Sequence, residues 1–318
     1  MPSPEDVHSA KAKATSSLRQ VTLTARETIL QKLPPALLDH IQDFSVPLQH
    51  SDMAPAQGAS LWLTAIPLTK MGWLLPRHTF WDALALRYQL PILDLPAHCT
   101  CDGRPAFTMN HSQGCKLGGW IVARHNDVRE FLIRWISVCA HPVREPPLHP
   151  LQGGDNFQYR TANIDPDARS DVKVEGLLDP HRPTFIDVAI FNRHELTYAQ
   201  KDLPSIFHDL ERRKERAYSE RIATIEHGHF TPFICSSLGA LGPAAHNIMR
   251  VLARHVTDKT RQSYSNVVLL MRADLSFTIT KAALACLRGP RAPCPKADFW
   301  AMTPAYLRAM ARLDSTNH

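Results

Sequence analysis

The chain has 318 residues, of which 44% are hydrophobic and 21% are charged. This composition provides a core for one large or two linked domains and excludes wholesale disorder. Lysine and arginine together number 36 against 30 acidic residues, which gives a net charge of +6. The excess favours an anionic partner but does not choose between nucleic acid, a membrane surface and an acidic protein.

Signals for secretion or membrane insertion are not found in the sequence. The N-terminal 20 residues include Glu5, Asp6, Lys11 and Lys13 and have no apolar segment, so no signal peptide is expected. The most apolar stretch, Leu61–Leu75, is interrupted by proline, lysine and glycine and is too short for a membrane helix. Seven cysteines are too few for a disulfide framework in a chain of this length. We therefore expect an intracellular protein in a reducing compartment.

The N-terminal third of the chain is expected to be largely helical. Residues 1–58 are predicted to form a helical, partly disordered lead-in, with apolar residues at helical spacing over Thr22–Leu38. Residues 59–119 are predicted to form a helical block that contains a short amphipathic helix at Phe80–Tyr88. This block ends in the segment 96–119, which is rich in proline, glycine, cysteine and histidine and is typical of a metal-held loop.

From residue 120 onward the pattern changes to mixed helix and strand. Helices are predicted at His125–Cys139, Leu203–Glu226, Pro243–Thr257 and Tyr264–Leu287, and strands at Ser170–Val174, Thr184–Phe191 and Thr231–Ser237. Turn residues between the first two strands predict a hairpin. The fold class expected for residues 120–289 is therefore α/β (α+β), with a small mixed sheet flanked by helices. Residues 290–318 are expected to form a loosely held tail.

The metal-held loop contains a set of zinc-ligand residues. Cys99, Cys101, His111 and Cys115 have the spacing C-x-C, nine residues, H-x3-C. Three thiolates and an imidazole make a closed tetrahedral site, which is the structural type of zinc centre. The alternative is that these are ordinary buried cysteines beside a surface histidine. We predict a structural zinc knuckle because four such residues rarely fall within one short loop.

Two aspartates are predicted to lie at the edges of the paired strands. Asp171 stands in Arg-Ser-Asp-Val-Lys-Val, and Asp187 stands in Phe-Ile-Asp-Val-Ala-Ile, where an acid among apolar residues is costly to bury. If the strands form a hairpin, the two carboxylates can converge and hold Mg²⁺, which prefers oxygen ligands. Such an ion would activate water and neutralise charge on a phosphodiester. The competing interpretation is two ordinary strand-end aspartates.

Further candidates occur on the predicted helices. Lys214 and Tyr218 are four residues apart and share one helix face, where a lysine could polarise a metal-bound phosphate. A solvated charged surface is the alternative for this helix. Arg124 and His125 open the helix after the knuckle, where backbone N–H groups favour anions. His125 could equally be a capping or core histidine.

The positive charge is concentrated near the C-terminal end. Between Pro243 and Arg291 there are eight basic and two acidic residues, a difference that equals the net charge of the whole chain. Arg250 and Arg254 share a helix face, and Arg261 follows closely. As a set, these arginines could follow a DNA backbone, although a solvated surface explains any one of them.

Taken in order, these motifs resemble the C-terminal region of non-LTR retrotransposon polyproteins. The resemblance rests on the knuckle, on Arg124-His125-Asn126, on the two aspartates and on Lys214-x3-Tyr218, and it covers residues 58–289. In that family, a zinc knuckle precedes a restriction-like endonuclease of the PD-(D/E)XK fold. The knuckle here departs from the family spacing of C-x2-C and H-x4-C, and Ser170 stands where the family has proline.

The resemblance implies a role for each motif. Asp171 and Asp187 would hold a catalytic Mg²⁺, and Lys214, with Tyr218 beside it, would replace the lysine that family members carry at the place of Ala189. Arg124 and His125 would contact the DNA backbone or support the site. The family nicks DNA to expose a 3′-hydroxyl that primes reverse transcription.

The resemblance also implies a cellular setting. DNA would be the target, element RNA and a reverse transcriptase encoded upstream would be further partners, and the protein would be nuclear with no membrane attachment. A polymerase is not expected within these 318 residues, because the chain lacks a Tyr/Phe-x-Asp-Asp motif.

The expected function is therefore a metal-dependent DNA endonuclease with zinc and magnesium as its metals. The first alternative is a catalytically inactive, zinc-containing nucleic-acid-binding protein derived from a decayed element. The second is a protein-interaction module whose zinc loop is purely structural.

Overall fold

The computed structural model describes residues 60–88, 90, 92, 95–151, 157–198 and 200–289, together with Gln20 and Thr24. Contacts divide the chain into the units Met1–Ser45 and Val46–His318, and the fold below is that of the second unit. The helix predicted over Thr22–Leu38 and the tail predicted over 290–318 lie outside the described residues.

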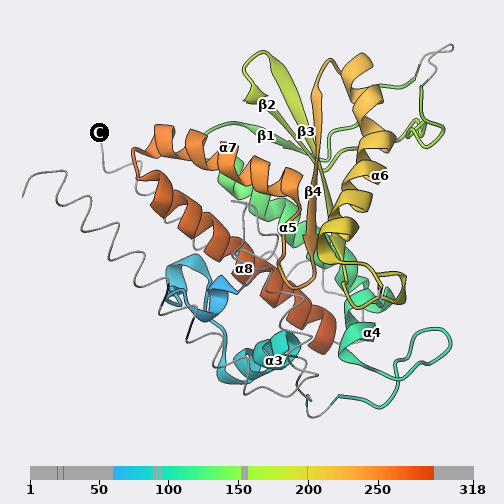
Figure 1. The fold of residues 1–318 in the computed structure, drawn as a ribbon, viewed down its shortest axis with the longest axis vertical. Coiled ribbons are helices and arrows are strands. Elements are labelled where there is room, and N and C mark those ends of the chain that lie inside the picture. Colours follow the sequence, from blue (N-terminus) through green and yellow to red (C-terminus); the bar gives the residue numbers. More distant parts are fainter. Residues whose placement is uncertain are drawn as a thin grey trace, which may run out of the picture. The chain divides into compact units, whose positions relative to one another are not determined.

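The described part of the second unit begins with three α-helices, continues with three strands, a helix and a fourth strand, and ends with two helices (Figure 1). The α-helices are α3 (Arg77–Tyr88), α4 (Met109–Gly114), α5 (Trp120–Ile136), α6 (Leu203–Thr224), α7 (Pro243–Thr260) and α8 (Tyr264–Arg288). The strands are β1 (Pro142–Arg144), β2 (Val172–Asp179), β3 (Arg182–Phe191) and β4 (His229–Ser236). Short 3-10 turns occur at Leu61–Leu63, Thr69–Met71, Leu117–Gly119 and Leu196–Tyr198.

The four strands form one mixed sheet in the order β1-β2-β3-β4. β1 pairs with β2 and β2 with β3 in antiparallel fashion, whereas β3 and β4 are parallel. A parallel connection needs a crossover, and α6 supplies it. The predicted hairpin is confirmed, and Gly176 at φ 72° lies where its register shifts.

Helices cover both faces of the sheet (Figure 1). On one face, α5, α7 and α8 bury a large apolar core against β2, β3 and β4. On the other face, α6 packs Ile206, Phe207 and Leu210 against Phe191 and Ile234. Because side chains alternate along a strand, the two cores use alternate residues of β3. The predicted mixed sheet flanked by helices is therefore confirmed.

The ends of the long helices follow from local sequence. Asp202 caps α6 by accepting a hydrogen bond from the Ser205 N–H at 3.0 Å, and proline occupies the first turn. Ser263 caps α8 in the same way through Asn266. α7 ends where Arg261 adopts a left-handed conformation with φ 58°.

The predicted helical block packs onto α8 through a second core. Trp62, Trp73 and Leu86 are buried there with Phe277 and Leu284 of α8. A buried carboxylate fixes this packing: Asp274 of α8 accepts hydrogen bonds from the indole N–H groups of Trp73 at 3.2 Å and Trp135 at 2.9 Å. The block is therefore anchored to both α8 and α5.

The long loop between β1 and β2 is held by one buried arginine. Arg221 of α6 is 1% exposed and donates hydrogen bonds to the backbone carbonyls of His149, Asn163 and Asp165 at 2.7–3.0 Å. These bonds pair both terminal nitrogens of the buried guanidinium with backbone carbonyls. The loop leads directly into Asp171, so Arg221 helps to fix the approach to β2.

Two elements differ from the sequence expectation. The sequence does not predict β1, because several prolines from Pro142 onward favour a loop there, but proline is tolerated at the first residue of an edge strand. The segment 96–119 was expected to have little regular structure and instead contains the helix α4. Among the described residues, no helix is both long enough and apolar enough to cross a membrane.

One half-buried acid on α5 predicts a pH-dependent stability. Burial raises the pKa of Asp127 to about 7, with Arg134 lowering it and Glu130 raising it further. The folded state thus binds the proton more tightly than the unfolded state, so stability should fall as pH rises from about 4 to about 7. We expect Asp127→Asn to match the wild-type melting temperature near pH 4 and to exceed it above pH 7. Thermal unfolding across this range measures the difference.

The exposed Asp167 offers the matched control for this prediction. Asp167→Asn should leave the pH profile of the melting temperature unchanged, since this side chain is exposed to solvent. If Asp127→Asn were equally stabilising at pH 4 and pH 8, the proposed cause would be wrong.

Candidate functional site

Asp171 and Asp187 lie where β2 and β3 stop pairing. The antiparallel ladder runs to the pair of Val172 and Ile186. Asp171 immediately precedes β2, and Asp187 follows Ile186 on β3, which continues alongside β4. The register therefore places the two aspartates opposite one another at the point where the strands separate.

Hydrogen bonds hold the Asp171 side chain in place at the opening, which is the point where β2 and β3 separate. The carboxylate oxygen Oδ2 of Asp171 accepts the Val188 N–H at 2.6 Å, a bond that takes the place of a ladder bond. The hydroxyl of the buried Ser170 donates to the Ile186 carbonyl at 2.9 Å. Ser170 thus joins the two strands by a hydrogen bond, which a proline at this position could not make.

His125 reaches Asp171 from α5. Its Nε2 lies 3.2 Å from Asp171 Oδ2 and 3.1 Å from the Val188 carbonyl. Because both neighbours are acceptors, Nε2 carries a proton and donates to them. Burial lowers the pKa of His125, but the hydrogen bond and charge of Asp171, with smaller contributions from Asn126 and Asp187, raise it overall. The arrangement favours an imidazolium that fixes the Asp171 carboxylate.

Lys214 reaches Asp187 from the other face of the sheet. Its Nζ lies 2.7 Å from Asp187 Oδ2, and Asp187 is only 6% exposed. Burial raises the pKa of Asp187 and so does the charge of Asp171, whereas Lys214 and His125 lower it; the net shift is upward. Apart from the Lys214 ion pair, Asp187 Oδ2 has no hydrogen-bond partner among the described residues. A buried carboxylate oxygen with free lone pairs is suited to a cation.

Tyr218 lies beside Lys214 on α6 and is held by its neighbours. Its ring stacks on Phe230 at 5.3 Å between centroids, and Lys214 Nζ lies 5.7 Å from its centre. Its hydroxyl accepts a hydrogen bond from Asn163 Nδ2 at 3.1 Å. Asn163 belongs to the loop between β1 and β2, and the sequence contains no signal that would have identified it.

The structure contradicts the prediction that Arg124 contacts a DNA backbone. Arg124 is 2% exposed, and its guanidinium donates to Gln113 through the side-chain Oε1 and the backbone carbonyl, each at 3.1 Å. A residue so enclosed cannot reach a phosphate on the surface. The contacts of Arg124 are compatible with the other expectation for this residue, which is that it supports the site from behind.

The other predicted DNA-binding arginines are exposed. Arg250 and Arg254 lie on the solvent side of α7, and Arg261 lies at its C-terminal end. Ile248 and Leu252 on the opposite side of the same helix are fully buried. These arginines are available to an anionic partner.

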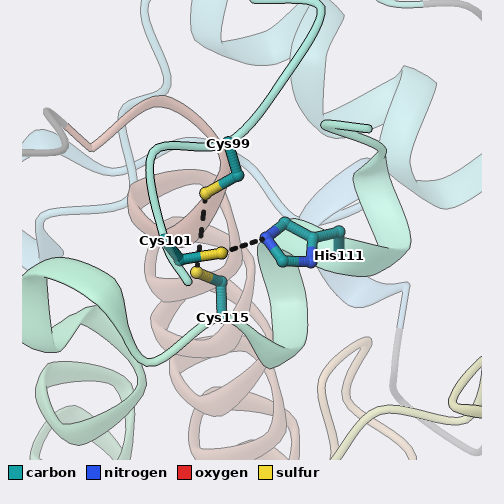
Figure 2. Close-up of side chains that lie close together, drawn as sticks. All are labelled: Cys99, Cys101, His111 and Cys115. Atoms are coloured by element: carbon teal, nitrogen blue, oxygen red, sulfur yellow. Dashed lines mark hydrogen bonds between the residues drawn. The ribbon is translucent and has the colours of Figure 1, made fainter. Parts of the chain in front are cut away.

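The predicted zinc ligands converge on one point. Figure 2 shows the side chains of Cys99, Cys101, His111 and Cys115 directed toward one another, and their candidate ligand atoms all lie within 4.8 Å of each other. Cys99 Sγ lies 3.8 Å from Cys115 Sγ, and Cys101 Sγ lies 3.6 Å from His111 Nε2. Tetrahedral zinc with Zn–S of ~2.3 Å and Zn–N of ~2.0 Å would give about 3.8 Å and 3.5 Å. The cluster could therefore hold a zinc ion.

The protonation of the cluster also favours a cation. Burial raises the pKa of Cys99, but hydrogen bonds from the Cys101 backbone and from His111, Cys101 and Cys115 lower it to about 6. Burial and the neighbouring thiols raise the pKa of Cys101 to about 11. One thiolate is thus present near neutral pH before any metal binds.

α4 carries part of the zinc set and is too short to be stable by itself. It spans six residues, with His111 within it and Cys115 at its C-terminal cap. Thr108 caps its first turn by accepting the His111 N–H at 3.0 Å. Gln113 lies between His111 and Cys115 and contacts α5 and α8. Its position between these two residues is the sequence signal that could have identified it as part of the site.

No family model matches this chain, and no curated protein matches it either. The function must therefore be argued from the fold and the site themselves. What they define is an α/β protein with a Cys3His cluster that could hold zinc and a second cluster of two carboxylates, a lysine and a histidine.

Proposed function

We propose that this protein is a metal-dependent DNA endonuclease of retrotransposon origin that nicks DNA by hydrolysing a phosphodiester. One observation carries the proposal: the ion pairs His125–Asp171 and Lys214–Asp187 lie at directly opposed positions where β2 and β3 stop pairing. The order of elements, a helix, three strands, a helix and a parallel strand, agrees with a restriction-endonuclease-like core. The exposed arginines of α7 supply a positive surface for DNA.

Asp171 and Asp187 would hold Mg²⁺ in this proposal. Bound Mg²⁺ would supply an activated water and neutralise charge on the phosphodiester. The fit is supported by the buried Asp187 Oδ2, which among the described residues is paired with the Lys214 ammonium alone and so retains a lone pair for a cation. His125 holds the Asp171 carboxylate in place through Nε2, and the adjacent Val188 N–H holds it from the other side.

Lys214 would act on the substrate beside Asp187. Its ammonium is held at 2.7 Å from Asp187 Oδ2, so a phosphate bound to a metal held by that carboxylate would lie close to a positive charge. Such a charge stabilises the additional negative charge of the transition state. Lys214 comes from α6, whereas position 189 on β3, where family members carry lysine, is alanine.

The test is a nicking assay with supercoiled plasmid and the whole protein. We expect conversion to the open circle with Mg²⁺ and none when a chelator replaces the metal. Salt-sensitive DNA binding without nicking, in either Mg²⁺ or Mn²⁺, would instead support the alternative of an inactive nucleic-acid-binding protein. The exposed arginines of α7 are also consistent with that alternative. Neither nicking nor binding would favour the protein-interaction module. Nuclear localisation and association with element RNA and a reverse transcriptase belong to the same proposal.

Tyr218 allows its hydroxyl and its ring to be tested separately. Because Asn163 already occupies the hydroxyl, Tyr218→Phe should keep the nicking rate within about threefold of the wild type. Tyr218→Ala removes the ring beside Lys214 and the stack on Phe230, and should lower the rate by about tenfold or more. Initial nicking rates at saturating DNA measure both effects. Equal loss in the two variants would place the hydroxyl in the reaction itself.

A further inference from the structure

Two contacts join the Cys3His cluster to the carboxylate site. The first is the pair of hydrogen bonds from Arg124 to Gln113, which lies between the ligands His111 and Cys115. Arg124 immediately precedes His125, the residue that holds Asp171. The second is the hydrogen bond from Asn192 Nδ2 to the Asn110 carbonyl at 3.1 Å. Asn192 directly follows β3, so α4 contacts both elements that shape the opening.

The side chains at this junction are buried and joined to one another by hydrogen bonds. Gln113 is 4% exposed, and its Nε2 donates to the Ala283 carbonyl of α8 at 3.0 Å while its Oε1 accepts from Arg124. Arg124 has no acidic partner in these contacts, since both acceptors belong to Gln113. A buried guanidinium that lost these acceptors would be strongly unfavourable, so the start of α5 would have to move.

α4 is the element most dependent on a bound metal. A six-residue helix is not stable alone, and this one carries His111 and ends at Cys115. Loss of the metal would therefore remove the scaffold that presents Gln113 to Arg124. Movement of Arg124 would carry His125 with it, because the two are consecutive in α5.

We propose that metal binding at the Cys3His cluster positions the His125–Asp171 pair through Gln113 and Arg124. Arg124 is a positioning residue: it acts on the site through His125 and does not touch the substrate. The inference that this controls nicking rests on the proposed function, but the structural coupling does not. The cluster is thus more than a folding element, since its occupancy sets the geometry of a second site.

Amide exchange at Val188 reports the coupling without any need for activity. The Val188 N–H donates to Asp171 Oδ2 and is protected only while that carboxylate is held in place. In the zinc-loaded wild type, chelation of zinc should speed exchange of the peptide containing Val188 by about tenfold or more. Peptides from α7 should be unaffected, which shows that the chain has not unfolded.

The variant Arg124→Met should break the coupling. At saturating zinc, the variant should bind about one zinc ion per chain. Its Val188 amide should exchange as fast as that of the chelated wild type, and chelation should not increase this rate further. Arg134→Met is the matched control, because Arg134 lies on the same helix and pairs with Asp274 instead; it should behave as the wild type. Gln113→Met, which leaves the backbone acceptor for Arg124, provides a milder variant should Arg124→Met fail to fold.

The outcomes separate this inference from the proposed function. If chelation left Val188 exchange unchanged in the wild type, or if its effect persisted in Arg124→Met and Gln113→Met, the coupling would be refuted. If the wild type failed to nick DNA yet showed the exchange pattern above, the endonuclease would be refuted and the coupling would stand. If both hold, Arg124→Met should lower the nicking rate at saturating DNA by about tenfold with little change in KM.

Discussion

Replacing Asp187 by alanine is expected to lower Mg²⁺-dependent nicking by roughly 10³-fold or more. The substitution removes one of the two carboxylates that would hold the metal and also removes the partner of Lys214. With the ammonium no longer held at 2.7 Å, its position beside the phosphate would be lost as well. The rate of conversion of supercoiled plasmid to the open circle measures the effect.

An aspartate on the same hairpin supplies the control. Asp179 lies at the far end of β2, where it is paired with His229 at 3.4 Å, and Asp179→Ala should nick DNA at the wild-type rate. DNA binding by Asp187→Ala should stay within about threefold of the wild type, since phosphate contacts by surface arginines dominate the affinity. Undiminished nicking by Asp187→Ala would remove Asp187 from the active site.

A second substitution, at Lys214, shows whether Asp187→Ala loses nicking because a charge is removed from the site or because the protein misfolds. Asp187→Ala leaves a partly buried lysine without its anion, whereas Asp187→Ala combined with Lys214→Ala removes both charges. The double variant should recover thermal stability but not nicking. Recovery of nicking in the double variant would show that the single variant failed only through misfolding.

The strands and the acids could be predicted because each leaves a local mark in the sequence. Asp187 stands among apolar residues that favour a buried strand, and a carboxylate is tolerated there only with a partner. The zinc ligands are similarly visible, because four residues of the right chemistry fall within one short segment. Local composition was sufficient for these features.

The partners of those residues have no local signal in the sequence, because tertiary packing decides them; only the resemblance pointed to Lys214 and His125. Nothing local to α6 distinguishes Lys214 from the other charged residues of its helix; its role depends on α6 crossing β3 at Asp187. Arg124 beside His125 looks like a phosphate contact, yet Gln113, eleven residues away, encloses it. The sequence does not predict α4 because a six-residue helix lacks the repeating apolar pattern of a longer one.

Substitution of Cys101 by serine is expected to abolish zinc binding and to unfold the region around the cluster. Zinc content should fall from about one ion per chain to near zero, because a serine hydroxyl replaces a thiolate ligand. Zinc binding by small finger domains is worth about 10–16 kcal/mol of folding free energy, so this loss exceeds what the local packing can offset. Metal analysis and amide exchange over residues 96–119 provide the two measurements.

Cys139 is the matched control, since it is a free, half-buried cysteine outside the cluster. Cys139→Ser should keep full zinc content and the protection of residues 96–119. In Cys101→Ser, the disruption should extend to Phe107 and Cys99, which are buried against α8 in the same core as Trp62. Exchange in α7 should stay as slow as in the wild type, because the buried apolar residues of α7 belong to the other core. Unchanged zinc content in Cys101→Ser would refute the metal centre, and with it the coupling that begins there.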